Sequence, residues 1–313
     1  MKRISTVSKI RFLQDYVKKK HKKWHKEHPE NIAGFRIGKK TKNGITSRYY
    51  SIIFHVIEKT GERNLDKNVI IPKYFTIKFP DGIRRKIKTD VEQTGIFKLQ
   101  LGITDEVTSA YSDNYGSAGL FVKDSDNKVF VLTNYHVVAE RMIMNRKYHY
   151  KRKPNQVKND VKIISNNGNV LLGRFEEGII SHDIDVAFVQ LPIEADQRMN
   201  RLPDNNRVKG RLATRPYPHS FIGKPLHVYS YHNRMGVKGN INDNSSILRT
   251  DNPKIYFEDI VQITPRITNG GDSGGIVLTP SFSVIGLVVG ADDNYSYAIP
   301  LYKINDFKEL FII

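Results

Sequence analysis

Apolar and polar positions near the start of the chain alternate at helical spacing. The apolar positions recur at i, i+3, i+6 and i+7, as Ile10, Leu13, Tyr16 and Val17. This pattern predicts one helix over residues 3–29, ended by Pro29, because the residue before a proline disfavours the helical conformation. A loop is then predicted by three glycines, Gly34, Gly38 and Gly44.

The pattern changes to strands after this loop. Residues 49–57 are rich in β-branched and aromatic side chains and predict a strand. Residues 74–79 and 83–91 flank a Pro-Asp-Gly turn and predict a hairpin. We therefore expect residues 49–103 to form a small α/β or β-rich unit of their own.

Short β-type runs separated by turn signals fill the rest of the chain, from about residue 108. This spacing predicts an all-β barrel or sandwich, and residues 302–313 predict a final helix. The runs are residues 118–123, 129–133, 161–164, 170–175, 185–191, 226–231, 237–241, 260–264, 275–278, 284–289 and 296–301.

Composition narrows the class of protein. The 313 residues have a formal net charge of +18, but 39% are hydrophobic, enough for a substantial core. Cysteine is absent, which excludes disulfides, thiolate zinc sites and a cysteine nucleophile and fits a reducing, cytoplasmic compartment. No run approaches the ~18 apolar residues of a membrane helix. The basic N-terminus lacks the apolar core of a secretory signal.

The positive charge is concentrated at the N-terminus. Residues 1–48 carry 15 Lys and Arg against 3 acidic residues, and the densest run is Lys18–Lys26. One interpretation is a solvated helix or tail that maintains solubility. The other is a docking site for nucleic acid or an acidic protein surface, with Trp24 available to stack on a base.

A glycine-rich pentapeptide carries the strongest chemical signal. Ser273 lies in the sequence Gly271-Asp272-Ser273-Gly274-Gly275. The glycines allow a tight turn that exposes the hydroxyl. They also let the N–H groups of Gly271 and Ser273 converge on an oxyanion. A serine nucleophile still needs a base beside it.

Two further segments supply a candidate base and a candidate acid. His136 follows an apolar run that ends at Thr133, and Asp185 stands directly before residues 186–191. An isolated histidine is more often a surface or core residue, and an acid before a strand is often only a turn residue. Asp183 is a competing candidate, but the register of the strand favours Asp185.

Together the three segments resemble a trypsin-like (chymotrypsin-fold) serine peptidase over roughly residues 108–302. That family has its triad in the chain order His, Asp, Ser, which His136, Asp185 and Ser273 match. Residues 284–300 and the lack of cysteine are similar to the disulfide-free, HtrA-like bacterial branch. No PDZ domain is expected, because the chain ends at Ile313.

The resemblance implies a mainly β fold, a chymotrypsin-like double six-stranded β-barrel. It would be preceded by the basic helical extension (1–48) and the small unit (49–103), with barrels over 104–200 and 201–313 and a C-terminal helix. It implies catalysis by His136, Asp185 and Ser273 without a metal or organic cofactor. It also places a substrate pocket at Ile267, Thr268, Gly290, Ala291 and Tyr295.

The function expected is an intracellular serine endopeptidase that cleaves a protein substrate after small or medium aliphatic residues. An acid at Ile267 would be needed for Lys or Arg, and a histidine at Val288 for Glu. Asp272 would need a partner, supplied internally or by another protein, since an unpaired buried charge is costly. The alternative is a catalytically silent binding module on the same fold, acting through its basic surface and possibly on nucleic acid.

Overall fold

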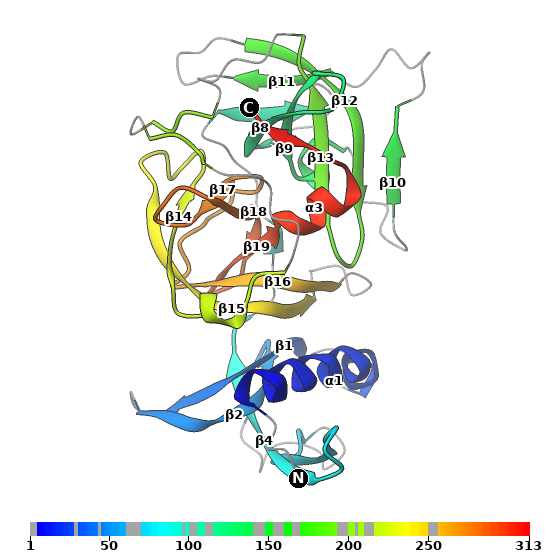
Figure 1. Ribbon diagram of the computed structural model, residues 1–313, viewed down its shortest axis with the longest axis vertical. Helices are drawn as coiled ribbons and strands as arrows, with labels where there is room; N and C mark the ends of the chain where they lie inside the picture. The colour runs from blue at the N-terminus through cyan, green and yellow to red at the C-terminus, as the bar shows by residue number, and fades with distance from the viewer. Residues whose placement is uncertain are drawn as a thin grey trace.

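The computed structural model has two parts, an N-terminal unit and a larger pair of β domains (Figure 1). It describes residues 5–27, 31–42, 45–60, 70–95, 98–99, 105–109, 115–139, 148–152, 160–164, 170–192, 200–203, 206–209, 216–249 and 256–313.

The N-terminal unit is a helix packed on a sheet. Helix α1 (Thr6–Glu27) buries the apolar face that its spacing predicts, and Trp24 extends that face onto the aromatic core of the sheet. The sheet contains β1 (Ile32–Lys42), β2 (Ile45–Val56), β3 (Tyr74–Lys78) and β4 (Arg84–Gln93). The predicted helix and the 74–91 hairpin are therefore present.

The loop predicted from Gly34, Gly38 and Gly44 is wrong over residues 32–42, because this segment is strand β1. Gly34 allows β1 to approach β15 (Val237–Arg249) closely and does not form a turn. A Cβ at Gly34 would lie 2.4 Å from the Ile247 oxygen of β15. Gly34 and Phe35 pair there with Leu248 and Ile247. Gly44 lies outside the described residues. Residue 48, the expected limit of the basic extension, lies within β2.

The C-terminal domain is a closed six-stranded barrel. Its strands run in the order β14-β17-β18-β19-β16-β15, and a further pairing of β14 with β15 closes the ring. Through β15 and β1 the barrel continues into the N-terminal sheet. The other barrel strands are β14 (Pro225–Tyr229), β16 (Tyr256–Thr264), β17 (Ile276–Leu278), β18 (Val284–Ala291) and β19 (Ser296–Pro300).

The preceding domain is a second, strongly curved sheet. Its order is β20-β8-β9-β13-β12-β11-β6-β7, with β10 on β12, and no pairing among the described residues closes it. These strands are β6 (Glu106–Ser109), β7 (Tyr115–Ser117), β8 (Leu120–Lys123), β9 (Val129–Thr133), β10 (Tyr148–Lys151), β11 (Asp160–Ile164), β12 (Val170–Ile180), β13 (Asp185–Gln190) and β20 (Phe311–Ile312).

The remaining elements are short. They are α2 (Tyr135–Val138), the 3₁₀ turn η3 (His219–Phe221), α3 (Leu301–Phe307) and β5 (Lys98–Leu99). The predicted C-terminal helix is thus limited to α3, and the chain then returns to pair β20 with β8. The expected fold class is confirmed: the protein is mainly β, with the N-terminal helix and two chymotrypsin-like β domains. Only the second of them is a closed six-stranded barrel among the described residues, and the first is an open half-barrel. No helix in the described ranges is long and apolar enough to cross a membrane.

Candidate active site

His136 and Asp185 form a buried pair at one end of the first β domain. His136 lies in α2, directly after β9, and Asp185 begins β13, which pairs with β9. Asp185 Oδ2 is 2.5 Å from His136 Nδ1, and both side chains are almost fully buried. Asp185 Oδ1 accepts the Tyr135 N–H at 2.6 Å. The carboxylate is therefore fixed from two sides and holds the imidazole ring in one orientation.

Asp183 has a different environment. Its side chain is 67% exposed, and Lys303 Nζ is 3.8 Å away. Asp185, in contrast, is fully buried, and the Asn134 side chain donates to its main-chain oxygen at 2.9 Å. Of the two acids weighed in the sequence, only Asp185 contacts the His136 imidazole.

The Ser273 loop lies between the two β domains. Gly271 and Gly274 have φ angles of +105° and +89°, conformations that favour glycine. The Ser117 N–H donates to the Ser273 oxygen at 2.7 Å. A Cβ at Gly274 would lie 2.6 Å from Thr133 Oγ1, three residues before His136. The loop therefore packs against the strand end that carries the histidine.

The expected exposure of the Ser273 hydroxyl is wrong: Ser273 is fully buried, and its hydroxyl donates to the Val289 main-chain oxygen at 3.2 Å. The main-chain N–H groups of Gly271 and Ser273 have no acceptor within the part of the chain that the structure describes. Two unsatisfied donors on either side of Asp272 are unusual for a buried loop and suit an oxyanion.

Asp272 has internal partners. Its carboxylate accepts hydrogen bonds from Ser230 Oγ (2.6 Å), the Asn269 N–H (2.7 Å) and Asn233 Nδ2 (3.3 Å). His232 Nδ1 lies 3.4 Å from Oδ1. Donors from Ser230, Asn233 and the Asn269 N–H thus satisfy the buried carboxylate.

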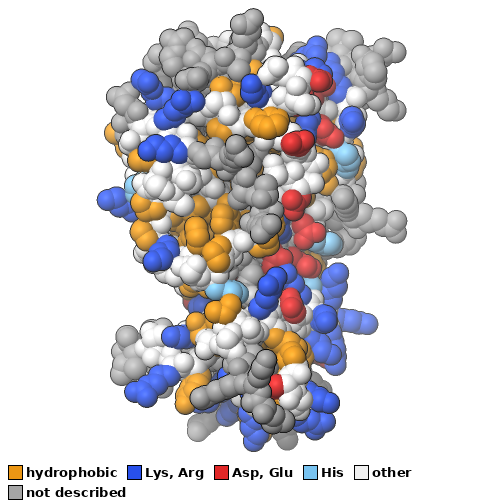
Figure 2. Space-filling view, in the orientation of Figure 1, with side chains coloured by type: hydrophobic (Ala, Val, Ile, Leu, Met, Phe, Trp, Pro, Cys, Tyr) orange, Lys and Arg blue, Asp and Glu red, His pale blue; other side chains and the backbone are white. Residues whose placement is uncertain are grey.

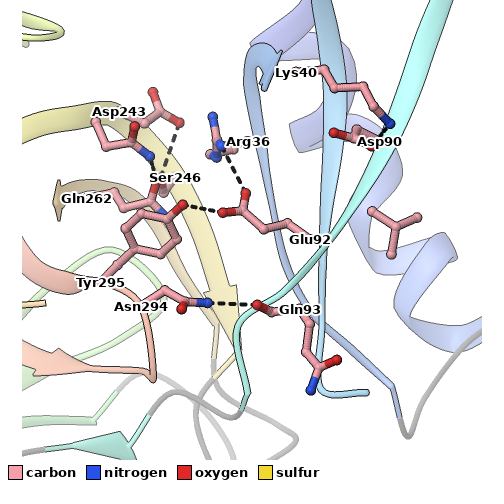
Figure 3. Close-up of polar contacts among 12 residues, drawn as sticks. Arg36, Lys40, Asp90, Glu92, Gln93, Asp243, Ser246, Gln262, Asn294 and Tyr295 are labelled. Carbon is pink, nitrogen blue, oxygen red and sulfur yellow. Dashed lines mark hydrogen bonds and ion pairs between the residues drawn. The ribbon is translucent and has the colours of Figure 1, made fainter. Parts of the chain in front are cut away.

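The five residues expected to form the pocket occupy two neighbouring regions. Thr268 is buried, and its hydroxyl donates to Ser296 Oγ at 2.8 Å, which also accepts the Ile267 N–H at 2.9 Å. Gly290 and Ala291 end β18. Tyr295 is nearly buried but points toward the N-terminal unit, where its hydroxyl contacts Glu92 (Figure 3).

A polar network around Tyr295 joins the N-terminal unit to the second barrel (Figure 3). Glu92 on β4 accepts hydrogen bonds from the Tyr295 hydroxyl and from Arg36 Nη2, the latter at 2.9 Å. Burial alone would raise the pKa of Glu92, but the charge of Arg36 and these hydrogen bonds lower it below its usual value. Burial and the Glu92 charge raise the pKa of Tyr295, so the proton stays on the phenol.

The segment after Glu92 continues along the pocket region. Asn294 Nδ2 donates to the Gln93 oxygen at 2.7 Å, and the Asp293 N–H donates to the Thr94 oxygen at 3.1 Å. Strand β5 then pairs antiparallel with the end of β18, with Leu99 opposite Gly290 and Lys98 opposite Ala291. Part of the chain's own backbone therefore occupies the edge of β18 directly after Val289, whose main-chain oxygen accepts the Ser273 hydroxyl.

The basic run Lys18–Lys26 is an ordered part of α1. Trp24 packs 5.2–5.3 Å, centroid to centroid, from Phe35, Phe54 and Phe75, so it is not available to stack on a base. Lys18 pairs with Asp259 at 2.5 Å, and the other lysines of the run point outward.

Several contacts at the site were not expected from the sequence. The roles of Val289, Ser117 and Glu92 depend on segments far apart in the chain, and no local pattern marks them. Among the described residues, no group of three or more His, Cys, Asp or Glu is placed to hold a metal ion.

No protein-family model and no curated protein matches the chain. Among solved structures it is similar to Nocardiopsis protease (NAPase), with 16% identity and a TM-score of 0.47 over 69% of this chain and 98% of that one. It is also similar to a glutamic acid-specific serine protease, with 15% identity and a TM-score of 0.49 over 68% and 100%. A third is the HtrA-type protease AlgW, with 16% identity and a TM-score of 0.36 over 63% and 55%. Such low sequence identities and TM-scores do not establish the chemistry of this site.

Proposed function

We propose that this protein is a serine endopeptidase that uses His136, Asp185 and Ser273. The observation that carries the proposal is the buried contact of 2.5 Å between Asp185 Oδ2 and His136 Nδ1. The glycine-flanked loop of Ser273 packs against Thr133, at the end of the strand that leads to His136. A carboxylate in this position holds Nδ1 protonated and leaves Nε2 to accept a proton. The peptidase part would comprise residues 104–313, with its two barrels divided near residue 200.

The reaction would begin at the Ser273 hydroxyl. The hydroxyl breaks its hydrogen bond to the Val289 oxygen and gives its proton to His136 Nε2. Its Oγ then attacks the scissile carbonyl carbon. The carbonyl oxygen takes the electron pair of the C=O bond, and the N–H groups of Gly271 and Ser273 stabilise its negative charge. Each such donor is worth about 10²–10³ in rate.

The tetrahedral intermediate then collapses. The C–N bond breaks, and the leaving amine takes the proton from His136, which leaves an ester on Ser273. Water repeats the sequence: it gives a proton to His136, attacks the ester and releases the acid, and the proton returns to Ser273 Oγ. Asp185 stabilises the imidazolium in both halves and stays ionised.

The edge of β18 would bind the substrate backbone. This edge already accepts an extended segment, because β5 pairs with Gly290 and Ala291. An extended peptide can add to such an edge through main-chain hydrogen bonds, with a pocket that selects side chains. Ser273 is fully buried, so the substrate must displace part of the chain that covers it.

The pocket supports cleavage after small or medium aliphatic residues. Ile267 is half-buried and apolar, and Thr268 is uncharged, so neither residue can pair with a basic or acidic side chain of a substrate. The Thr268 hydroxyl already donates its hydrogen bond to Ser296. A panel of fluorogenic peptides would show fastest turnover after Ala, Val or Leu. Fastest turnover after Lys, Arg or Glu would refute this specificity.

Labelling with a fluorophosphonate probe tests the activity, because the probe reacts only with an activated serine. Wild type and Ser281→Ala, a control at an exposed serine of the same barrel, should label. Ser273→Ala should not. If wild-type protein that is folded by circular dichroism does not label, the peptidase proposal fails.

That negative result would favour the alternative, a silent binding module. The observation that favours it is the Ser273 hydroxyl on the Val289 oxygen, an arrangement in which the hydroxyl proton is not directed at His136. A cytoplasmic location is part of the main proposal and rests on the absence of cysteine.

A further inference from the structure

A basic cavity opens in the N-terminal unit, formed entirely by α1, β1, β2 and the β3–β4 hairpin. Its volume is about 770 Å³, and its floor is apolar, made by Ile10, Leu13 and Ile87. None of its described lining residues belongs to either barrel. Binding sites for small organic ligands are roughly 300–1,000 Å³, so the volume suits a ligand larger than a single ion.

The cavity follows from the pairing of β2 and β4. These strands pair in parallel only over Ile52–Val56 and Thr89–Gln93. Residues 45–51 and 84–88 have no such pairing, and the two strands diverge below α1 (Figure 1). Residues 48–50 of β2 and 85–88 of β4, which lie in these unpaired stretches, line the cavity.

Positive charge surrounds this opening, and the described lining residues include no acid. Six cations line it, namely Lys9, Lys39, Arg48, Arg85, Lys86 and Lys88. Arg85 pairs with Asp81 at 2.6 Å. The other five have no carboxylate partner among the residues described. Lysine and arginine side chains appear at several places on this unit in the face shown in Figure 2.

Aromatic rings accompany the cations. Tyr49 is 73% exposed at the rim, whereas most aromatic rings of this unit are in its core. Tyr50 lies beneath Lys39, with Nζ 5.5 Å from the ring centroid, and Phe79 lies beneath Arg85 at 4.8 Å. An exposed ring among unpaired cations can stack on a nucleobase while the cations neutralise phosphates.

We propose that this cavity binds single-stranded nucleic acid, with phosphates on Lys39, Arg48, Lys86 and Lys88 and a base on Tyr49. An acidic peptide would satisfy the cations but would leave the tyrosine face and the apolar floor unused. A duplex would present its phosphates on a rigid cylinder and keep its bases stacked inside. The site thus differs from the Lys18–Lys26 run, whose tryptophan is in the core.

Fluorescence anisotropy with a labelled 15-nucleotide single strand, on the full-length protein at 50–200 mM salt, tests the proposal. Lys86→Glu with Lys88→Glu should weaken binding at least tenfold and reduce the salt slope by about 1.4, because each neutralised phosphate of a single strand contributes ~0.7. Tyr49→Ala should weaken it about 5- to 150-fold, the range for one stacked base. Lys86→Arg with Lys88→Arg should preserve binding.

The matched control is Lys19→Glu with Lys22→Glu, which reverses the same amount of charge on the outer face of α1. This control should keep most of the affinity. Equal losses in both charge-reversal variants would show that binding depends only on net charge and would overturn the proposal. Equal competition by a duplex or by a poly-glutamate peptide would also overturn it. The assay does not depend on peptidase activity, so the two proposals fail separately.

Discussion

Tyr295, in the turn after β18, donates its phenolic hydrogen bond to Glu92 on β4 of the N-terminal unit. With the contacts of Gln93 and Thr94 to the same turn, this fixes residues 92–95 along the 292–295 segment. The chain that follows then reaches Gly290 as strand β5. The N-terminal unit therefore delivers its own backbone to the edge where a substrate would bind.

We expect β5 and the substrate to compete for this edge. Leu99→Pro removes a main-chain N–H and disfavours pairing with Gly290, so kcat/KM for a fluorogenic peptide should rise severalfold. Leu99→Ala keeps the N–H and is the control. Equal kcat/KM in wild type and the proline variant would show that β5 does not limit access.

Asp185→Asn should lower kcat by about 10⁴-fold, because a neutral amide does not hold the required tautomer of His136. The amide oxygen can still accept the Tyr135 N–H, so the variant should fold. Steady-state kinetics with a matched thermal melt separate the two effects. A loss below tenfold in a folded variant would exclude the role given to Asp185.

The internal partners of Asp272 predict activity that does not require cleavage of the chain, because the carboxylate needs no new N-terminal amine to pair with. Its carboxylate is satisfied by Ser230, Asn233 and the Asn269 N–H. A short peptide fused before Met1 should therefore leave kcat/KM unchanged while mass spectrometry shows an intact chain. Activity that appears only after cleavage would contradict this and would assign Asp272 a different partner.

Asp243 predicts a pH-dependent stability. Burial raises its pKa from 3.8 to about 6, although Arg36 opposes the shift. The folded state thus holds this proton more tightly than the unfolded state, and stability falls as pH rises from about 4 to about 6. Asp243→Asn removes this dependence, so the stability of wild type relative to the variant should fall by about 3 kcal/mol over that range.

Urea denaturation at pH 4 and pH 7 measures this difference. Asp126→Asn, at a carboxylate that is 66% exposed, is the control. Its stability relative to wild type should be nearly the same at the two pH values. A wild-type advantage over Asp243→Asn that is the same at both pH values would show that Asp243 does not carry a raised pKa.

The local patterns predicted most of the fold. The spacing of Ile10, Leu13 and Val17 identified the buried face of α1, and the short β-type runs identified both β domains. The strand at residues 32–42 was missed because glycine signals a turn in sequence, whereas Gly34 is needed for the approach of β1 to β15. Such a contact depends on a segment more than 200 residues away.

In the candidate site, too, local sequence patterns predict some features and not others. The motifs around His136, Asp185 and Ser273 can be found in the sequence because each is a short local pattern, and the structure brings Asp185 to His136. The Tyr295–Glu92 contact has no such pattern, since it depends on how two separate units pack. Likewise, Trp24 in a lysine run suggests exposure, but its helical phase places it in the core.

The pairing of β1 with β15 makes one hydrogen-bonded sheet out of two segments that the sequence separates. A cut in the connection between residues 95 and 105 would therefore not release the first part of the chain. It would turn a single polypeptide into a two-chain complex, joined by strand pairing and by the Arg36–Glu92–Tyr295 network. The N-terminal unit would thus stay attached to the second barrel even without a covalent link between them.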